Sequence, residues 1–344
     1  MTVHSATPPL GFMMIGVSGL ILTETEKVLL KHPLIAGVIL FSRNFQDRHQ
    51  LLALTTSIKK INPDHVIAVD HEGGRVQRFK HDFTLLPDMR AIGQLCQQNP
   101  QLALDKAYSV GVMIGIELIA TGIDFSFTPV CDLDYQNNAA IGNRAFSKNP
   151  NHVSQLTCAL HNGLKAAGSI GVAKHFPGHG YVSGDSHNTT PVDTRPLNVL
   201  EHNDIVPFKA LITQHIEGIM PAHIVYPALD PDFTAVSSQK WMHYLRDTLG
   251  FNGIIISDDF DMQGAISMGD AKTRAHLCFN AGIDLLLCCN QTDTIVTILG
   301  AFPLEQHPNL RLKAKMLGLR AKKTYPFDFN KEAEWQTAHS ILFS

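Results

Sequence analysis

The sequence lacks long apolar runs and blocks of like charge. It carries 28 Lys and Arg against 31 Asp and Glu over 344 residues, and the basic residues do not gather into stripes. A nucleic acid or an anionic membrane is therefore not an expected partner. No apolar run approaches the length of a membrane-spanning helix, and no cationic segment precedes the apolar residues near residue 10. We therefore expect neither a spanning helix nor a signal peptide.

Disulfide signatures are missing as well. The six cysteines stand mostly among apolar residues, which is typical of reduced, buried thiols. Because such thiols belong to a reducing compartment, we expect a cytoplasmic protein.

The chain has no linker, since no Pro/Ser-rich, weakly hydrophobic or like-charged block of linker length divides it. A chain of this length can bury the core of one large α/β domain. We therefore predict a single domain over residues 1–344, with helices at its C-terminal end that close on it.

Short aliphatic runs alternate with helical patterns along the whole chain. Asn99 and Asn149 each precede a proline, which is the pattern of a helix cap followed by the first helical residue. Continuous apolar strands that alternate with helices predict an α/β protein with a single (β/α)8 TIM barrel. A doubly wound sheet is the alternative, but its G-x-G-x-x-G motif is absent. The eight expected strands span residues 12–15, 37–41, 66–69, 124–127, 171–174, 218–221, 254–257 and 283–288.

Polar side chains follow five of the expected strands. In a barrel, functional groups come from the C-terminal strand ends, so these side chains should converge on one rim. Each one alone could instead cap a helix or form a surface ion pair. The polar residues at these strand ends are Asp70, Asp132, Lys174, His175, His223, Asp258 and Asp259.

The stretch GVAKHFPGHGYVSGDSH, residues 171–187, combines a strand end with a loop rich in glycine. Asp185 and His187 stand one residue apart, so the carboxylate can hold one imidazole nitrogen and leave the other free for proton transfer. A metal site formed by these two residues with His175 and His179 is an alternative, although no H-E-x-x-H motif accompanies it. A surface loop that merely carries histidines is another.

Four motifs resemble those of one enzyme family. They are VDHEGGRVQR, GNRAF, KHFPGHG followed by DSH, and GFNGIIISDDFDM. In these motifs the chain resembles the β-N-acetylglucosaminidases of glycoside hydrolase family 3, the β-hexosaminidases that act on cytoplasmic intermediates of cell-wall recycling. The resemblance extends roughly from Gly11 to the eighth expected strand. His71 stands where the family more often has Gln.

The resemblance implies roles for single residues. It makes Asp258 the nucleophile, His187 the general acid/base and Asp185 the partner that orients His187. These residue types suit a retaining glycosidase, because a carboxylate can attack the anomeric carbon and an imidazole, with a pKa of about 6.5, can exchange protons near neutral pH. The residues implied to hold hydroxyl and acetamido groups of the terminal sugar are Asp70, Arg78, Arg144, Lys174 and His175.

The resemblance also implies the reaction. We expect a retaining exo-β-N-acetylglucosaminidase that removes terminal β-linked GlcNAc from GlcNAc-1,6-anhydroMurNAc peptides in peptidoglycan recycling, through a covalent glycosyl-aspartate. We expect a monomer with a small carbohydrate substrate and with no cofactor or metal. A related β-N-acetylglucosaminide phosphorylase, a metal-dependent barrel hydrolase and a sugar-binding protein without turnover are the alternatives.

Overall fold

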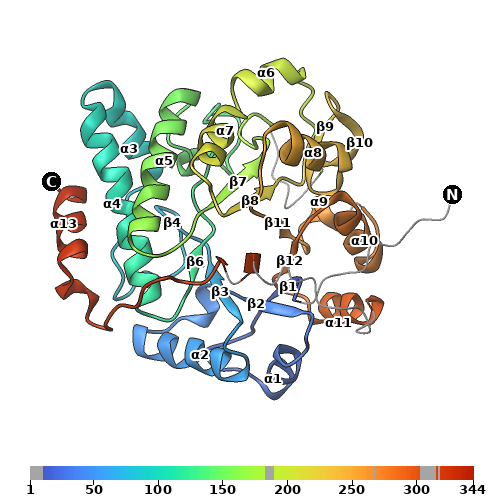
Figure 1. The fold of residues 1–344 in the computed structure, drawn as a ribbon, viewed down its shortest axis with the longest axis horizontal. Coiled ribbons are helices and arrows are strands. Elements are labelled where there is room, and N and C mark those ends of the chain that lie inside the picture. Colours follow the sequence, from blue (N-terminus) through green and yellow to red (C-terminus); the bar gives the residue numbers. More distant parts are fainter. Residues whose placement is uncertain (1–10, 183–189, 267, 303–314, 317) are drawn as a thin grey trace.

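The computed structural model describes residues 11–182, 190–266, 268–302, 315–316 and 318–344. Eight parallel strands form one sheet in the order β6-β3-β2-β1-β12-β11-β8-β7. Figure 1 shows these strands in the middle of the molecule with helices around them. The strands are β1 Met13–Gly16, β2 Ile35–Leu40, β3 Val66–Val69, β6 Phe125–Ser126, β7 Val172–Phe176, β8 Gly218–Pro221, β11 Ile254–Asp259 and β12 Leu285–Cys288.

The two edge strands of this sheet, β6 and β7, are joined through the residues that follow β6. The Val172 N–H donates to the Thr128 carbonyl at 2.8 Å, and the Cys131 N–H donates to the Lys174 carbonyl at 2.7 Å. Val130 and Lys174 form a parallel bridge at the same place. These bonds close the sheet, and the predicted (β/α)8 barrel is confirmed.

Helices alternate with the strands, and both predicted helix caps are confirmed. The Asn99 side chain accepts an N–H from the first turn of α4 (Pro100–Ile119) at 3.1 Å, and Asn149 accepts one from α5 (Pro150–Ala166) at 2.9 Å. The other helices are α1 Glu24–Leu30, α2 Arg48–Ile61, α3 Met89–Gln94, α6 Leu197–His202, α7 Val206–Thr213, α8 Gln239–His243, α9 Gln263–Ile266, α10 Ala271–Ala281, α11 Thr292–Ala301 and α13 Ala333–Leu342.

Two short antiparallel hairpins extend the loops at the strand ends. β4 (His71–Gly73) pairs with β5 (Val76–Gln77) after β3, and β9 (Val225–Tyr226) pairs with β10 (Asp230–Thr234) after β8. Both loops belong to the rim where the polar residues were expected. The short 3-10 segments are η1 Ser42–Asn44, η2 Leu95–Gln97, η3 Gly142–Arg144, η4 Ala235–Ser237 and η6 Phe329–Lys331, and the π segment is η5 Tyr244–Thr248.

The barrel strands are buried on both of their faces. Val66, Ile67, Ala68 and Val69 of β3 are all fully buried, and so is Val172 of β7. One face of each strand packs into the barrel interior and the other packs under the helices. This is why the strands are continuous aliphatic runs rather than alternating patterns.

The C-terminal helix α13 packs against α4. The Trp335 indole N–H donates to a Glu117 carboxylate oxygen at 2.8 Å and fixes this contact. The other C-terminal helical segment that we expected, residues 304–319 by their amphipathic pattern, lies mostly outside the described residues. In the part of the chain that the structure describes, no helix has both the length and the apolarity needed to span a bilayer.

Candidate active site

Lys174 is the shared cation of two carboxylates at the rim. Its Nζ lies 2.8 Å from an Asp70 oxygen and 2.7 Å from a Glu72 oxygen. Lys174 is the third residue of β7, Asp70 follows β3 directly, and Glu72 lies in β4. Burial opposes the charge on Lys174, but Asp70 and Glu72 together raise its pKa above the ordinary value. The barrel therefore brings these three side chains together in ionised form.

Arg144 completes this cluster from the loop that follows β6. Its Nε and Nη2 donate to the two Glu72 oxygens, both at 2.8 Å, and its Nη1 donates to the Ala140 carbonyl at 3.0 Å. Burial would raise the pKa of Glu72, but Arg144 and Lys174 lower it to about 2. The paired bonds fix the guanidinium plane, which is the geometry that favours Arg over Lys.

Asp70 is the more open of the two carboxylates. Its side chain is 21% exposed, and it also contacts Arg78, whose Nη2 lies 3.2 Å from the second Asp70 oxygen. Burial would raise the pKa of Asp70, but the positive charges of Lys174 and Arg78 hold it well below its usual range. An ionised carboxylate with two oxygens has lone pairs left for further donors, such as sugar hydroxyls.

His175 is oriented by Asp132, which is fully buried. The His175 Nδ1 lies 2.7 Å from one Asp132 oxygen, and the His175 and His179 main-chain N–H groups donate to the other at 3.2 and 2.7 Å. Burial would raise the pKa of Asp132, but His175 lowers it to about 2. An ionised carboxylate only accepts, so Nδ1 of His175 carries the proton and Nε2 is the nitrogen left for other partners.

His179 has a separate role in the same loop. The Asn138 amide donates to its Nδ1 at 3.0 Å, and also to the His179 and Val182 carbonyls. Burial, followed by the nearby His175, lowers the pKa of His179 to about 4. Within the described residues, no group of three His, Cys, Asp or Glu side chains is arranged to hold a metal ion.

The adjacent residues Asp258 and Asp259 at the end of β11 have opposite electrostatic environments. Burial would raise the pKa of Asp258, but His175, His223 and Lys174 lower it below its usual value. Burial raises the pKa of Asp259 to about 6. The Asp259 N–H donates to the Asp258 Oδ1 at 2.8 Å, which holds that carboxylate in place.

The Asp259 side chain is used within the protein. Its Oδ1 accepts the main-chain N–H groups of Asp261 at 3.1 Å and of Cys289 at 3.2 Å. It therefore joins the loop after β11 to the end of β12. Asp259 therefore has a structural role.

Asp185 and His187 lie outside the described residues. The described chain on either side of residues 183–189 is held by hydrogen bonds at Val182 and Asp193. The Asn138 amide donates to the Val182 carbonyl at 3.0 Å, and the Asp193 N–H donates to the Val225 carbonyl at 2.9 Å.

Two residues of the site were not assigned roles from the sequence. Glu72 was only part of a matching motif, and Asp132 was one of several polar residues after the fourth strand. The carboxylate of Glu72 becomes important because β4 turns it toward Arg144, and Asp132 because barrel closure buries it beside His175. Neither contact leaves a periodic signal in the sequence.

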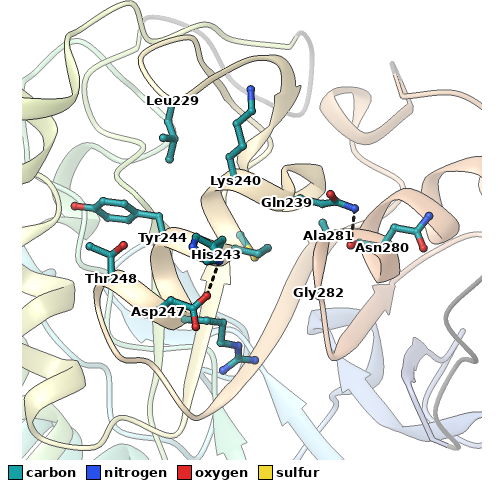
Figure 2. A pocket seen from close by; sticks show the side chains of 12 residues that line it. Leu229, Gln239, Lys240, His243, Tyr244, Asp247, Thr248, Asn280, Ala281 and Gly282 are labelled. Carbon is teal, nitrogen blue, oxygen red and sulfur yellow. Dashed lines mark hydrogen bonds and ion pairs between the residues drawn. The ribbon is translucent and has the colours of Figure 1, made fainter. Parts of the chain in front are cut away.

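A cavity of about 730 Å³ lies between the segment that contains α8 and η5, the end of α10 and the β9–β10 loop. Figure 2 shows residues that line it, among them Lys240 and the ion pair of His243 with Asp247, whose atoms lie 2.6 Å apart. None of the predicted site residues lines it. The strand ends, and not this cavity, hold the convergent acids and bases that chemistry requires.

The family model described as glycosyl hydrolase family 3 N terminal domain matches residues 12–307. The chain belongs to glycosyl hydrolase family 3.

Relatives place it among the β-hexosaminidases of that family. The beta-hexosaminidase of Aromatoleum aromaticum is 42% identical over 349 residues, which cover 99% of this chain and 98% of that protein. The beta-hexosaminidase of Bordetella avium is 47% identical over 292 residues, 84% of this chain and 83% of that protein. The structure of NagZ from Neisseria gonorrhoeae in complex with N-trifluoroacetyl-D-glucosamine is similar with a TM-score of 0.89 and 40% identity, covering 98% of each chain.

Proposed function

We propose that the protein is a retaining exo-β-N-acetylglucosaminidase that releases terminal β-linked GlcNAc from GlcNAc-1,6-anhydroMurNAc peptides in peptidoglycan recycling. The similar NagZ of Neisseria gonorrhoeae binds an N-acylated glucosamine, which supports GlcNAc as the sugar held here. We further propose that residues 1–344 act as one catalytic domain and as a monomer. The six cysteines are free, which supports a cytoplasmic location.

The observation that carries this proposal is the contrast between Asp258 and Asp259. A retaining glycosidase needs an ionised carboxylate against the anomeric carbon, and of two adjacent acids the one with the lowered pKa suits this role better. The pKa of Asp258 is lowered, whereas that of Asp259 is raised to about 6. With Oδ1 of Asp258 held by the Asp259 N–H, Oδ2 is the oxygen that attacks.

The reaction takes two steps on this assignment. In the first, Asp258 forms a bond to C1 of the sugar while the bond to the leaving oxygen breaks and that oxygen takes a proton from His187. In the second, His187 takes a proton from water, the water oxygen bonds to C1, and Asp258 leaves as a carboxylate. Asp185 orients His187 in both steps.

The remaining site residues hold the sugar. Asp70 and the Nε2 lone pair of His175 accept hydroxyl hydrogens, while Lys174 and Arg78 donate to hydroxyl oxygens. Arg144 supports the same end of the site, near the acetamido group. The charged cluster of Asp70, Lys174 and Arg144 supports this assignment, because charge-assisted hydrogen bonds are the stronger ones.

An assay with an aryl β-N-acetylglucosaminide tests the reaction class, run with and without phosphate and with and without chelator. We expect free GlcNAc in all cases. GlcNAc-1-phosphate would show a phosphorylase, and loss of activity with chelator would show a metal-dependent hydrolase. Binding of GlcNAc without release of the aryl group would show a sugar-binding protein. Release of GlcNAc from the anhydroMurNAc peptide then tests the substrate.

The proton donor is tested separately with His187→Ala. General acid catalysis contributes about 10²- to 10⁴-fold and matters most for a poor leaving group. We expect a large loss on a natural disaccharide and a much smaller loss on an activated aryl glycoside. Asp185→Ala should give a milder form of this pattern. Equal losses on both substrates would contradict the general-acid role.

A further inference from the structure

We propose that Arg195 is a positioning residue for His187, because it joins the two ends of the chain segment that contains His187. The inference rests on the proposed function, since it concerns the residue that would protonate the leaving oxygen. Arg195 lies just before α6 and has no role in the mechanism above. The contacts that carry the inference all lie among described residues.

The Arg195 guanidinium is held by two acids. Its Nε donates to Oδ1 of Asp193 at 3.0 Å, and its Nη2 donates to Oδ2 of the same residue at 2.7 Å. Its Nη1 donates to Oδ2 of Asp204 at 2.8 Å. Both acids are fully buried, and only 9% of Arg195 is exposed. Because two of its nitrogens bind one carboxylate, the plane of the guanidinium is fixed.

Two tyrosine rings contact this guanidinium. The Arg195 Cζ lies over the Tyr181 ring, 4.0 Å from its centroid, and 5.0 Å from the centroid of the Tyr135 ring. The two rings are nearly perpendicular, with their centroids 5.4 Å apart. An aromatic face attracts a cation, so the guanidinium holds the Tyr181 ring as well as the two acids.

This cluster joins the chain on the two sides of residues 183–189. Tyr181 precedes the segment, whereas Asp193 and Arg195 follow it. The contact of the Tyr181 ring with the Arg195 guanidinium therefore links one side directly to the other. His187 lies between them in the sequence.

The cluster rests on the loop that follows β6. The Tyr135 hydroxyl donates to Oδ2 of Asp204 at 3.0 Å, and the Tyr135 N–H donates to the Leu133 carbonyl at 3.1 Å. The Gly180 main chain packs against the same carbonyl so closely that a Cβ at Gly180 would overlap its oxygen. The chain that carries Tyr181 thus lies directly on the loop that carries Tyr135.

Joined ends restrict the segment that contains His187. When both ends of a segment are held, its residues can adopt fewer conformations. A general acid must lie within hydrogen-bond reach of the leaving oxygen, and a displacement of about 1 Å can cost about 10²-fold in rate. Release of either end from Arg195 should therefore lower the fraction of enzyme in which His187 is within reach. The loss should be largest with a leaving group that needs the proton.

Arg246 and Tyr108 provide matched controls. Arg246 also pairs with a carboxylate, that of Asp284 at 2.6 Å, and its Cζ also lies over an aromatic ring, 5.1 Å from the centroid. It resembles Arg195 in these contacts, but they stand at the strand starts, before β11 and β12. Tyr108 of α4 is 41% exposed, close to the 39% of Tyr181.

The test compares Tyr181→Leu and Arg195→Lys with the controls Tyr108→Leu and Arg246→Lys. Each enzyme is assayed for kcat/KM on a GlcNAc disaccharide, whose leaving group is a sugar, and on an activated aryl β-N-acetylglucosaminide. The readout is the ratio of the first value to the second. A loss of folded enzyme lowers both values equally and cancels in the ratio, whereas a misplaced proton donor lowers the disaccharide value more.

We expect the ratio to fall by about 10-fold or more in Tyr181→Leu and Arg195→Lys, with the aryl value within about threefold of wild type. Leu removes the ring that the cation contacts, and Lys keeps the charge without the paired bonds. Both controls should leave the ratio within about twofold of wild type, even where Arg246→Lys lowers Tm.

A double variant tests whether the effect passes through His187. In the His187→Ala background the proton donor is already gone, so Tyr181→Leu should lower the ratio no further. A direct contact of Tyr181 with the leaving sugar would instead give the same fall in both backgrounds.

Three results would overturn the inference. The first is an unchanged ratio in Arg195→Lys or, where that variant does not fold, in Tyr181→Leu. The second is an equal fall in a control, and the third is a full further fall in the His187→Ala background. His187→Ala alone separates the inference from the proposed function, because an unchanged ratio in that variant would contradict the general-acid role itself.

Discussion

Both ends of the barrel contain buried or half-buried acids, but the two ends use them differently. At the strand starts, three acids each stand one residue before a strand and accept an N–H from the start of the neighbouring strand. These contacts are Asp124 with the Ile67 N–H at 2.8 Å, Glu217 with the Gly171 N–H at 3.1 Å and Asp284 with the Ile255 N–H at 2.9 Å.

Each of these acids also has a cationic or imidazole partner from a helix. Lys59 lies 2.7 Å from Asp124, and Arg246 lies 2.6 Å from Asp284. The imidazole of His161 similarly faces Glu217. The acids at the strand starts thus join neighbouring strands and bind helices to them.

At the strand ends, Asp70 and Glu72 have side-chain partners instead. Asp70 and Glu72 are held by ion pairs with Lys174, Arg144 and Arg78. Asp124, Glu217 and Asp284 therefore hold strands and helices together. Asp70, which is paired with cations only, keeps charge and lone pairs that a ligand can use.

The largest effect that tests this comparison is expected from Lys174→Met. It removes the cation shared by two carboxylates, so the pKa values of Asp70 and Glu72 rise and their geometry relaxes. We expect kcat/KM on an aryl β-N-acetylglucosaminide to fall by at least about 10²-fold. Lys59→Met, which removes a cation at the other end, should leave kcat/KM of the folded enzyme within about threefold. Similar losses in both variants would contradict the division between the two ends.

A smaller effect is expected for stability in Asp284→Ala. This change leaves the Ile255 N–H without its acceptor and Arg246 without its carboxylate. We expect the free energy of unfolding to fall by about 1 to 3 kcal/mol in urea titrations, with kcat near wild type. Asp70→Ala is the matched variant, and it should lose activity while losing less stability. A larger loss of stability in Asp70→Ala than in Asp284→Ala would contradict this division of roles between the two ends of the barrel.

The smallest effect concerns Asp259 and pH. Its pKa is raised to about 6 from the ordinary 3.8, so the folded state binds this proton more tightly and loses stability as the pH rises between these values. Asp259→Asn keeps an acceptor for the two N–H groups and removes the titration. Relative to wild type, the variant should therefore gain about 1 to 3 kcal/mol of unfolding free energy between about pH 4 and pH 7. A constant difference in urea titrations across that range would show that the pKa is not raised.

Local patterns explain why the fold could be predicted from the sequence. The eight strands are buried on both faces, so each is a continuous apolar run, and α4 and α5 begin at their Asn-Pro caps. The observed ends of the strands differ from the expected ends where tertiary contacts determine them. β7 extends two residues beyond the expected 174, to Phe176, because it pairs with β8 as far as Pro221.

The site was predictable in part. Lys174, Asp70 and Asp258 stand at strand ends, and barrel topology alone brings such residues to one rim. The contacts of Glu72 with Arg144 are set by a hairpin and a loop far apart in the chain, and no local spacing encodes them. The hydrogen bond from Val172 of β7 to Thr128, which helps to close the barrel, is likewise not encoded by local spacing.

The proposed retaining mechanism depends most on Asp258 being the residue that bonds to the sugar. Incubation with an activated 2-fluoro glycosyl substrate, followed by peptide mapping by mass spectrometry, measures this directly. The 2-fluoro group slows both steps, and the activated leaving group lets the covalent enzyme accumulate. We predict one added sugar, located on Asp258 and absent from Asp258→Asn. Label on Asp259, or full inactivation without any covalent sugar, would contradict the assignment.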